Sequence, residues 1–165
     1  MSAKTKLVLV WLAIILVADQ LTKFIVDQTM PLHHSIAVID NLFSLTYIRN
    51  TGAAFGILAG SATAFRLPFL VVFSLVAIGF VVAMLRRLPE RETGLITALA
   101  FILGGAIGNL IDRIVYGEVV DFLDFYWSSY HWPAFNLADS FITIGVGITL
   151  YYLIAAKGKD PFAPN

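Results

Sequence analysis

The chain has 165 residues, of which 59% are hydrophobic and 13% are charged, and its formal net charge is zero. Average soluble domains carry about 25% charged residues, so this composition excludes an ordinary soluble domain and indicates an integral membrane protein. The zero net charge provides no basic excess to attract nucleic acid. The absence of cysteine excludes disulfides, thiolate metal sites and a cysteine nucleophile.

Four apolar stretches have about the 20 residues that an α-helix needs to cross a bilayer. They are residues 7–27, 67–86, 93–112 and 135–156. We therefore expect an all-α integral membrane protein with four transmembrane helices in one domain over residues 1–165. The first stretch has no small-residue cleavage site before Asp27, so we expect it to remain as a helix. Residues 157–165 predict a disordered polar tail.

The segment between the first two spans is too polar to cross a membrane. From Phe43 to Ile48, Ser44 and Thr46 alternate with apolar residues, which is the pattern of a strand. Asp40-Asn41 predicts a turn between two short strands. We expect a small extracytoplasmic sheet on the outer membrane face. Residues 53–58 predict a short interfacial helix that could close over a substrate as a lid. The sheet and this lid together occupy residues 36–60.

Charged and polar residues inside two of the spans require partners. Asp19 and Lys23 are four residues apart on one helix face, with the acid before the base, and predict an ion pair that supports the structure. Whether this pair also shapes a functional site stays open. The third span carries three glycines that permit close helix contact, Gly104, Gly105 and Gly108. Asn109 and Arg113 follow Gly105 at intervals of four residues and share its helix face, with Arg113 at the helix end.

The chain between Val119 and Ser140 carries an aspartate near each end, Asp121 and Asp139, in strongly apolar sequence. If the third and fourth spans are antiparallel neighbours, both carboxylates lie at one membrane level. Two carboxylates in a dry site share a proton, and such a pair can activate water and polarise a peptide carbonyl. The residues alone leave other roles open, namely a helix cap for Asp139, a surface acid for Asp121 with Asp124, or a proton or cation pathway. We expect residues 112–133 to form an aromatic-rich loop at the water interface.

The distribution of basic residues predicts the orientation. One side collects Lys4, Lys6, Arg86, Arg87, Arg91, Lys157 and Lys159, whereas the other has Lys23, Arg49, Arg66 and Arg113. Seven against four places both termini in the cytoplasm. No metal or other cofactor is predicted, because adjacent His33 and His34 cannot both face one ion from a regular helix and no H-E-x-x-H motif is present.

The chain resembles the lipoprotein signal peptidase (signal peptidase II) family. Five motifs in chain order carry the resemblance: Asp19-Gln20-Leu21-Thr22-Lys23, Asn50-Thr51-Gly52-Ala53-Ala54-Phe55, Gly104-Gly105-Ala106-Ile107-Gly108-Asn109-Leu110-Ile111-Asp112-Arg113, Val119-Val120-Asp121-Phe122 and Phe135-Asn136-Leu137-Ala138-Asp139. The resemblance as a whole covers most of the chain.

The resemblance implies an intramembrane aspartic endopeptidase of the bacterial cytoplasmic (inner) membrane, with its site near the outer face. The substrate would be a diacylglyceryl prolipoprotein arriving from membrane lipid, cut just before the lipidated cysteine, and the cyclic peptide globomycin would inhibit the enzyme. Asp121 and Asp139 match the catalytic pair. The substrate-binding positions match Asn50, Gly52, Asn109, Arg113 and Asn136. Four spans around one pair need no second copy, so we expect a monomer.

The rival hypothesis is a small proton- or ion-coupled membrane protein that uses Asp19, Lys23, Asp121 and Asp139 as relay groups. A relay requires charges distributed across the bilayer. The sequence instead places these residues in the outer half, and the second span, residues 67–86, has almost no polar content before its end.

Overall fold

The computed structural model describes residues 1–52 and 62–155. Its elements, in chain order, are α1 (Ala3–Thr29), β1 (Ser35–Ile39), β2 (Phe43–Asn50), α2 (Thr63–Arg87), α3 (Thr93–Tyr116), β3 (Val119–Trp127), β4 (Tyr130–His131) and α4 (Leu137–Ala155). The four helices are each long and apolar enough to cross a membrane. The predicted interfacial helix and the predicted tail lie outside the described residues.

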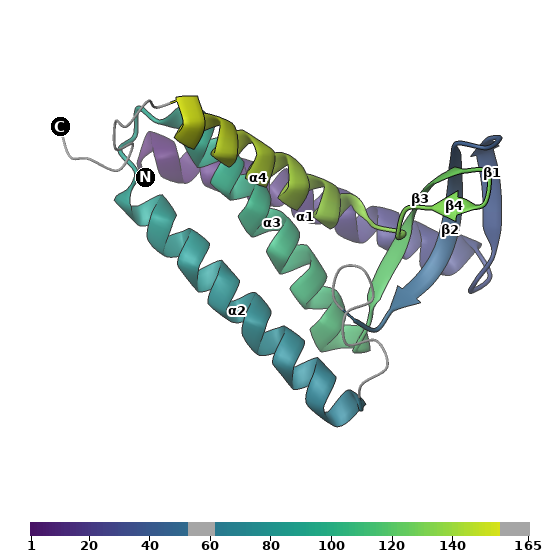
Figure 1. The fold of residues 1–165 in the computed structure, drawn as a ribbon. Coiled ribbons are helices and arrows are strands. Elements are labelled where there is room, and N and C mark those ends of the chain that lie inside the picture. Colours follow the sequence, from purple (N-terminus) through teal and green to yellow (C-terminus); the bar gives the residue numbers. More distant parts are fainter. Residues whose placement is uncertain (53–61, 156–165) are drawn as a thin grey trace.

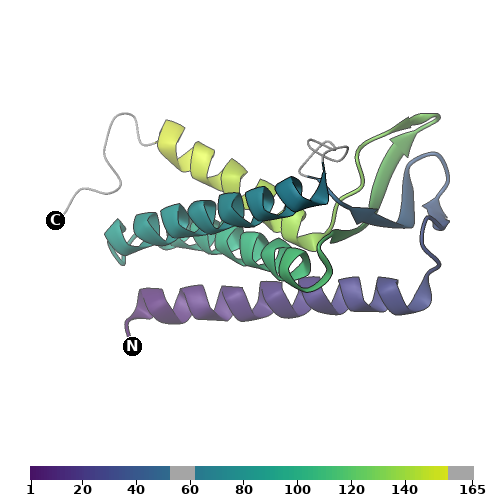
Figure 2. The ribbon, with the colours of Figure 1, turned by 90° about the horizontal axis from the view of Figure 1, so that it is seen from below.

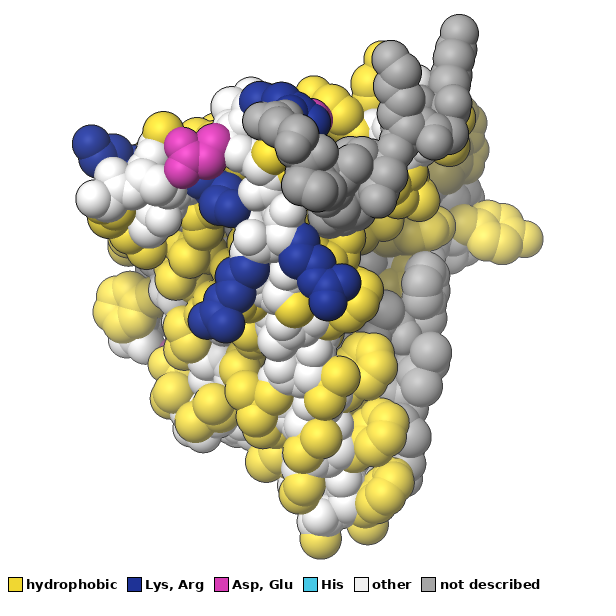
Figure 3. All heavy atoms as spheres, turned by 90° about the vertical axis from the view of Figure 1, so that its left-hand side faces the viewer, with side chains coloured by type: hydrophobic (Ala, Val, Ile, Leu, Met, Phe, Trp, Pro, Cys, Tyr) yellow, Lys and Arg dark blue, Asp and Glu magenta, His cyan; other side chains and the backbone are white. Residues whose placement is uncertain are grey.

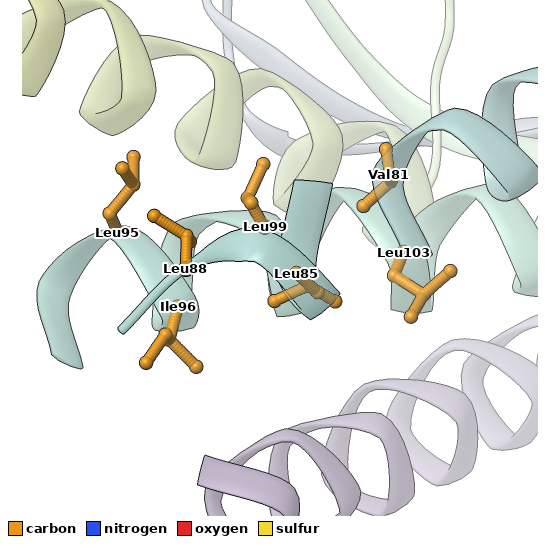
Figure 4. Packing of buried hydrophobic residues seen from close by; sticks show 7 residues of the cluster. All are labelled: Val81, Leu85, Leu88, Leu95, Ile96, Leu99 and Leu103. Atoms are coloured by element: carbon orange, nitrogen blue, oxygen red, sulfur yellow. The ribbon is translucent and has the colours of Figure 1, made fainter. Parts of the chain in front are cut away.

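Helix α3 occupies the centre of the bundle and contacts the other three helices. Figures 1 and 2 show α2 beside α3 but splayed away from it toward one end. Where these two helices converge, leucine, isoleucine and valine side chains form a buried cluster (Figure 4). Its members are Val81, Leu85, Leu88, Leu95, Ile96, Leu99 and Leu103. The central position of α3 is what allows its polar residues to contact both α1 and α4.

The N-terminus and the end of α4 lie at the end of the bundle opposite the sheet (Figures 1 and 2). Lysine and arginine side chains gather on this end, above an apolar surface (Figure 3). At this end Lys4 connects α1 to the end of α2, because its ammonium donates to the carbonyls of Leu85 and Leu88 at 3.1 and 2.8 Å. Basic side chains next to an apolar surface are typical of a membrane boundary.

The strands form one antiparallel sheet in the order β1-β2-β3-β4 at the other end of the bundle. The predicted hairpin of residues 36–48 is confirmed, with its turn between Ile39 and Phe43. The sheet is larger than expected, so the fold is mostly helical rather than all-α. Residues 112–133 were predicted as a loop, and this is wrong: α3 continues to Tyr116 and is followed directly by β3.

Gly117 makes this direct connection possible. Its φ of 74° lies in the left-handed region, where glycine has no steric penalty, and its N–H caps α3 by donating to the Arg113 carbonyl. The chain then turns into β3, where Asp121 lies opposite Ile48 and Asp124 opposite Ser44. Side chains three residues apart in a strand point to opposite faces, so Asp121 and Asp124 lie on opposite faces of β3 and do not form one acidic patch.

Candidate active site

A cavity of about 490 Å³ is enclosed by residues of α3, β3, α4 and the chain leading into α4. Both aspartates singled out in the sequence, Asp121 and Asp139, line it. So do three of the predicted substrate-binding residues, Asn50, Asn109 and Arg113. Most of the remaining wall is apolar. The fold thus brings Asn50 to one pocket with residues of two later stretches, 109–121 and 132–144.

Asn136 connects the two aspartates, although it is fully buried and does not line the cavity. Its side-chain amide donates to Asp121 Oδ1 at 2.8 Å, and its Oδ1 accepts the Asp139 N–H at 3.0 Å. In return, Asp139 Oδ2 accepts the Asn136 N–H at 3.3 Å. This is a reciprocal cap at the start of α4, in which the N-cap and the third helical residue satisfy each other's backbone donors. The predicted capping role of Asp139 is therefore compatible with a place in the cavity.

Asp121 is 2% exposed and accepts a second amide hydrogen bond, from Asn50 Nδ2 to Oδ2, at 2.8 Å. Gly52 orients that amide, because its N–H donates to Asn50 Oδ1 at 2.9 Å. Burial, and secondarily the charge of Asp139, raises the pKa of Asp121 to about 7 from an ordinary value of 3.8. The Asp121 carboxyl is therefore able to exchange a proton near neutral pH.

Asn109 connects Asp139 to the charged residues of α1. Its Nδ2 donates to Asp139 Oδ1 at 2.7 Å, and its Oδ1 accepts from the Lys23 ammonium at 2.9 Å. Because an ammonium has only donors, it requires the oxygen of the Asn109 amide to face Lys23, which turns the NH₂ group toward Asp139. Lys23 thereby fixes how Asn109 presents itself to the cavity.

Lys23 also forms two buried ion pairs, each at 2.9 Å, with Asp19 and Asp112. The first is the predicted i, i+4 pair. Sequence reasoning missed Asp112 and Gln20, whose amide donates to Asp112 Oδ1 at 2.9 Å. Both lie inside the motifs quoted above, but only the packing of α1 on α3 reveals their contact. All three charged groups are at least 97% buried, so this cluster holds the helices together only as a complete set.

The glycines of α3 permit the close packing on which these contacts depend. A Cβ on Gly105 would lie 2.3 Å from the Ala138 carbonyl oxygen, and one on Gly108 would lie 2.6 Å from Asp19 Oδ2. A Cβ on Gly104 would meet Ile15 of α1 at 3.0 Å. The predicted supporting role of these residues thus has a steric basis on two sides of α3.

Arg113 reaches the cavity from the end of α3. Its Nη1 donates weakly, at 3.4 Å, to the Asn109 carbonyl. Its Nε is buried and has no hydrogen-bond partner among residues 1–52 and 62–155. A buried donor without a partner is costly, which indicates that a bound molecule would satisfy it. Within the same ranges, no group of three histidine, aspartate or glutamate side chains is arranged to hold a metal ion.

Comparison with known proteins identifies the relatives of this chain. The family model described as Signal peptidase (SPase) II matches residues 11–155. The chain belongs to the signal peptidase II family. The lipoprotein signal peptidase of Geobacter sulfurreducens is 54% identical over 144 residues, covering 87% of this chain and 89% of the relative. That of Nitratidesulfovibrio vulgaris is 46% identical over 165 residues, covering 100% and 98%.

Two solved structures of bacterial membrane enzymes share the fold of this chain. A bacterial membrane enzyme determined by the in meso method at 2.3 Å resolution superposes with a TM-score of 0.82 at 31% identity, covering 92% of this chain and 89% of that one. A second, at 1.9 Å resolution, has a TM-score of 0.76 at 33% identity and covers 93% of both chains. The family and the four apolar helices together make this chain a multi-pass bacterial membrane protein and a protease.

Proposed function

We propose that this protein is an intramembrane aspartic endopeptidase that removes the signal peptide from diacylglyceryl prolipoproteins by cutting just before the lipidated cysteine. The observation that carries the proposal is that Asp121 and Asp139 line one cavity and are both bound by Asn136. Lipoprotein signal peptidases that match over most of the chain support the substrate class.

The chemistry follows from two carboxyl groups with one shared proton. One carboxylate takes a proton from water as the water oxygen attacks the scissile carbonyl carbon. The neutral carboxyl group donates its proton to the carbonyl oxygen. The resulting tetrahedral intermediate collapses by breaking the C–N bond, and the departing cysteine nitrogen takes up a proton. The raised pKa of Asp121 makes it a suitable neutral partner near pH 7.

Arg113 and Asn109 are proposed to hold the substrate next to this pair. The unpartnered Arg113 Nε is suited to a peptide or ester carbonyl of the substrate. Globomycin, as an inhibitor of the family, is expected to occupy the same cavity. One chain supplies every group of the site, so a monomer suffices.

We also propose that both termini face the cytoplasm and that the sheet and the cavity lie near the outer face of the inner membrane. The basic end of the bundle shown in Figure 3 supports this orientation. A lipid-borne substrate could then reach the two carboxylates without its cut bond crossing the bilayer core. An ion-coupled relay is disfavoured because the carboxylates cluster toward the sheet end of the bundle.

Cleavage of a diacylglyceryl prolipoprotein by purified variants tests the proposal. Asp121→Asn and Asp139→Asn should each reduce kcat by at least about 10³-fold while thermal unfolding shows folded protein. Asp124→Asn is the matched control, since Asp124 bonds His131 at 3.0 Å and does not line the cavity. In the same assay, Arg113→Ala should weaken substrate and globomycin binding more than folding. Near-normal cleavage by either Asp121→Asn or Asp139→Asn would refute the pair.

A further inference from the structure

Thr143 lies on α4, four residues after Asp139, and lines the same cavity. It was not singled out in the sequence. Its side chain is exposed, and the neighbouring wall is formed by Ile142 and Ile144. A hydroxyl group therefore stands between two isoleucines of the pocket wall, one helical turn beyond Asp139.

The hydrogen bonding of Thr143 differs from that of Ser140 and Thr149 on the same helix. Ser140 and Thr149, on the same helix, donate to the carbonyls of Asn136 and Gly145, four residues before each, at 2.9 and 2.8 Å. Such back-bonding is how a helix in lipid satisfies a hydroxyl. In the described part of the chain, the Thr143 hydroxyl has no hydrogen-bond partner. It is thus available to a molecule in the cavity.

A peptide cut inside a membrane creates a demand for such a group. A carboxyl pair can reach a scissile bond only where the substrate backbone is not helical. Each N–H or C=O released from a helix in a dry environment costs several kcal/mol unless it finds a partner. The cavity must therefore supply hydrogen-bond partners beside the cut bond as well as at it.

The position of Thr143 indicates which part of the substrate it contacts. Helix α4 runs from the sheet toward the opposite end of the bundle, so Thr143 lies deeper in the spanning region than Asp139 (Figure 1). Four helical residues correspond to about 6 Å. An extended chain covers this distance in about two residues. The contact therefore falls about two residues from the cut bond, on the signal-peptide side, which spans the membrane.

We propose that the Thr143 hydroxyl binds a backbone amide or carbonyl of the signal peptide, about two residues before the cut bond. This inference rests on the proposed function and adds a substrate-positioning residue to it. Thr143 does not contact the reacting atoms. Its hydroxyl lowers the free energy of the unwound substrate, and the two isoleucines beside it contact the flanking side chains.

Kinetics with a diacylglyceryl prolipoprotein peptide test this role. Thr143→Val keeps the shape and removes the hydroxyl, so kcat/KM should fall about three- to tenfold, the value of one hydrogen bond. Thr143→Ser should restore it. Thr149→Val, the matched control on the same helix, should leave kcat/KM unchanged, because Thr149 does not line the cavity. Thermal unfolding of each variant establishes that the protein is folded.

A second substrate separates a direct contact from an indirect one. Replacing the single backbone amide two residues before the cut bond by an ester should slow the wild-type enzyme but should not further slow Thr143→Val. Wild-type kinetics in Thr143→Val, equal losses in Thr143→Ser and Thr143→Val, or additive losses with the ester substrate would each overturn the inference alone. A wild-type protein that fails to cleave the amide peptide would overturn the proposed function as well.

Discussion

Asn136 illustrates how much one side chain organises in this protein. It caps α4, contacts both Asp121 and Asp139, and also donates to Asn109 Oδ1 at 3.1 Å. A carboxamide is suited to these tasks because it offers two donors and one acceptor without a charge. A charged residue here would alter the proton equilibrium of the pair. The site consists of carboxylates oriented by amides, and the buried Lys23 ammonium contacts Asn109 and not Asp121 or Asp139.

The raised pKa of Asp121 predicts a change in stability with pH. Between about pH 4 and 7 the unfolded chain has released this proton and the folded protein retains it, so wild-type stability falls as pH rises. Asp121→Asn lacks the titrating carboxyl group and therefore this pH dependence. Its melting temperature relative to wild type should therefore rise from pH 4 to pH 8 in detergent. A difference that stays constant across this range would show that Asp121 does not hold its proton in the fold.

Removing Lys23 should destabilise the protein strongly. Lys23→Met leaves Asp19 and Asp112 buried without their cation, which costs about 3–5 kcal/mol. The substitution also frees the Asn109 amide to rotate, because Lys23 no longer binds its oxygen. The folded fraction of Lys23→Met should therefore cleave the prolipoprotein slowly. Chemical unfolding in micelles measures the first effect. Lys6→Met, at an exposed position of the same helix, is the control and should behave as wild type.

At the scale of elements, the contact of α3 with α4 decides whether the pocket forms. Asn109 and Arg113 come from α3, and Asp139 comes from α4, so the distance between the helices sets the size of the cavity. The glycine face of α3 allows this approach. In lipid, close packing of small residues supplies the association energy that hydrophobic burial supplies in water.

Gly105→Ala tests this packing. The added Cβ would lie 2.3 Å from the Ala138 carbonyl oxygen, which is backbone and cannot move without shifting α4. Overpacking of this kind costs about 1–3 kcal/mol and should also reduce cleavage. Gly147→Ala is the control on α4, where nothing lies within 4 Å, and it should be neutral or slightly stabilising. Equal melting temperatures for the two variants would contradict the steric argument.

At the scale of the molecule, the end with the basic residues and the end with the sheet define two sides of a membrane. The natural absence of cysteine makes the orientation simple to measure. Ser2→Cys should react with a membrane-impermeant maleimide only after cells are permeabilised. Ser129→Cys, in the turn between β3 and β4, should react in intact spheroplasts. The reverse labelling pattern would overturn the proposed orientation.

The sequence by itself determined the number of apolar helices, the first hairpin, the ion pair of Asp19 with Lys23, and Asp121 and Asp139 as the candidate pair. These are local properties, set by hydropathy, alternation and i, i+4 spacing. It did not predict β3, because the apolar run from Val119 to Trp127 contains two aspartates and its strand partner is β2, about 75 residues earlier in the chain.

Only the tertiary structure decided which polar residues meet. Gln20 and Asp112 lie within sequence motifs, but no local pattern pairs them across α1 and α3. Thr143 belongs to none of the motifs, and only the cavity reveals its place. The resemblance had already favoured Asp121 over Asp124, and the alternation of β3 gives the physical reason, because the two side chains point to opposite faces. Long-range packing assigns these roles because a buried polar group is defined by the partner that satisfies it, and that partner is set by the fold.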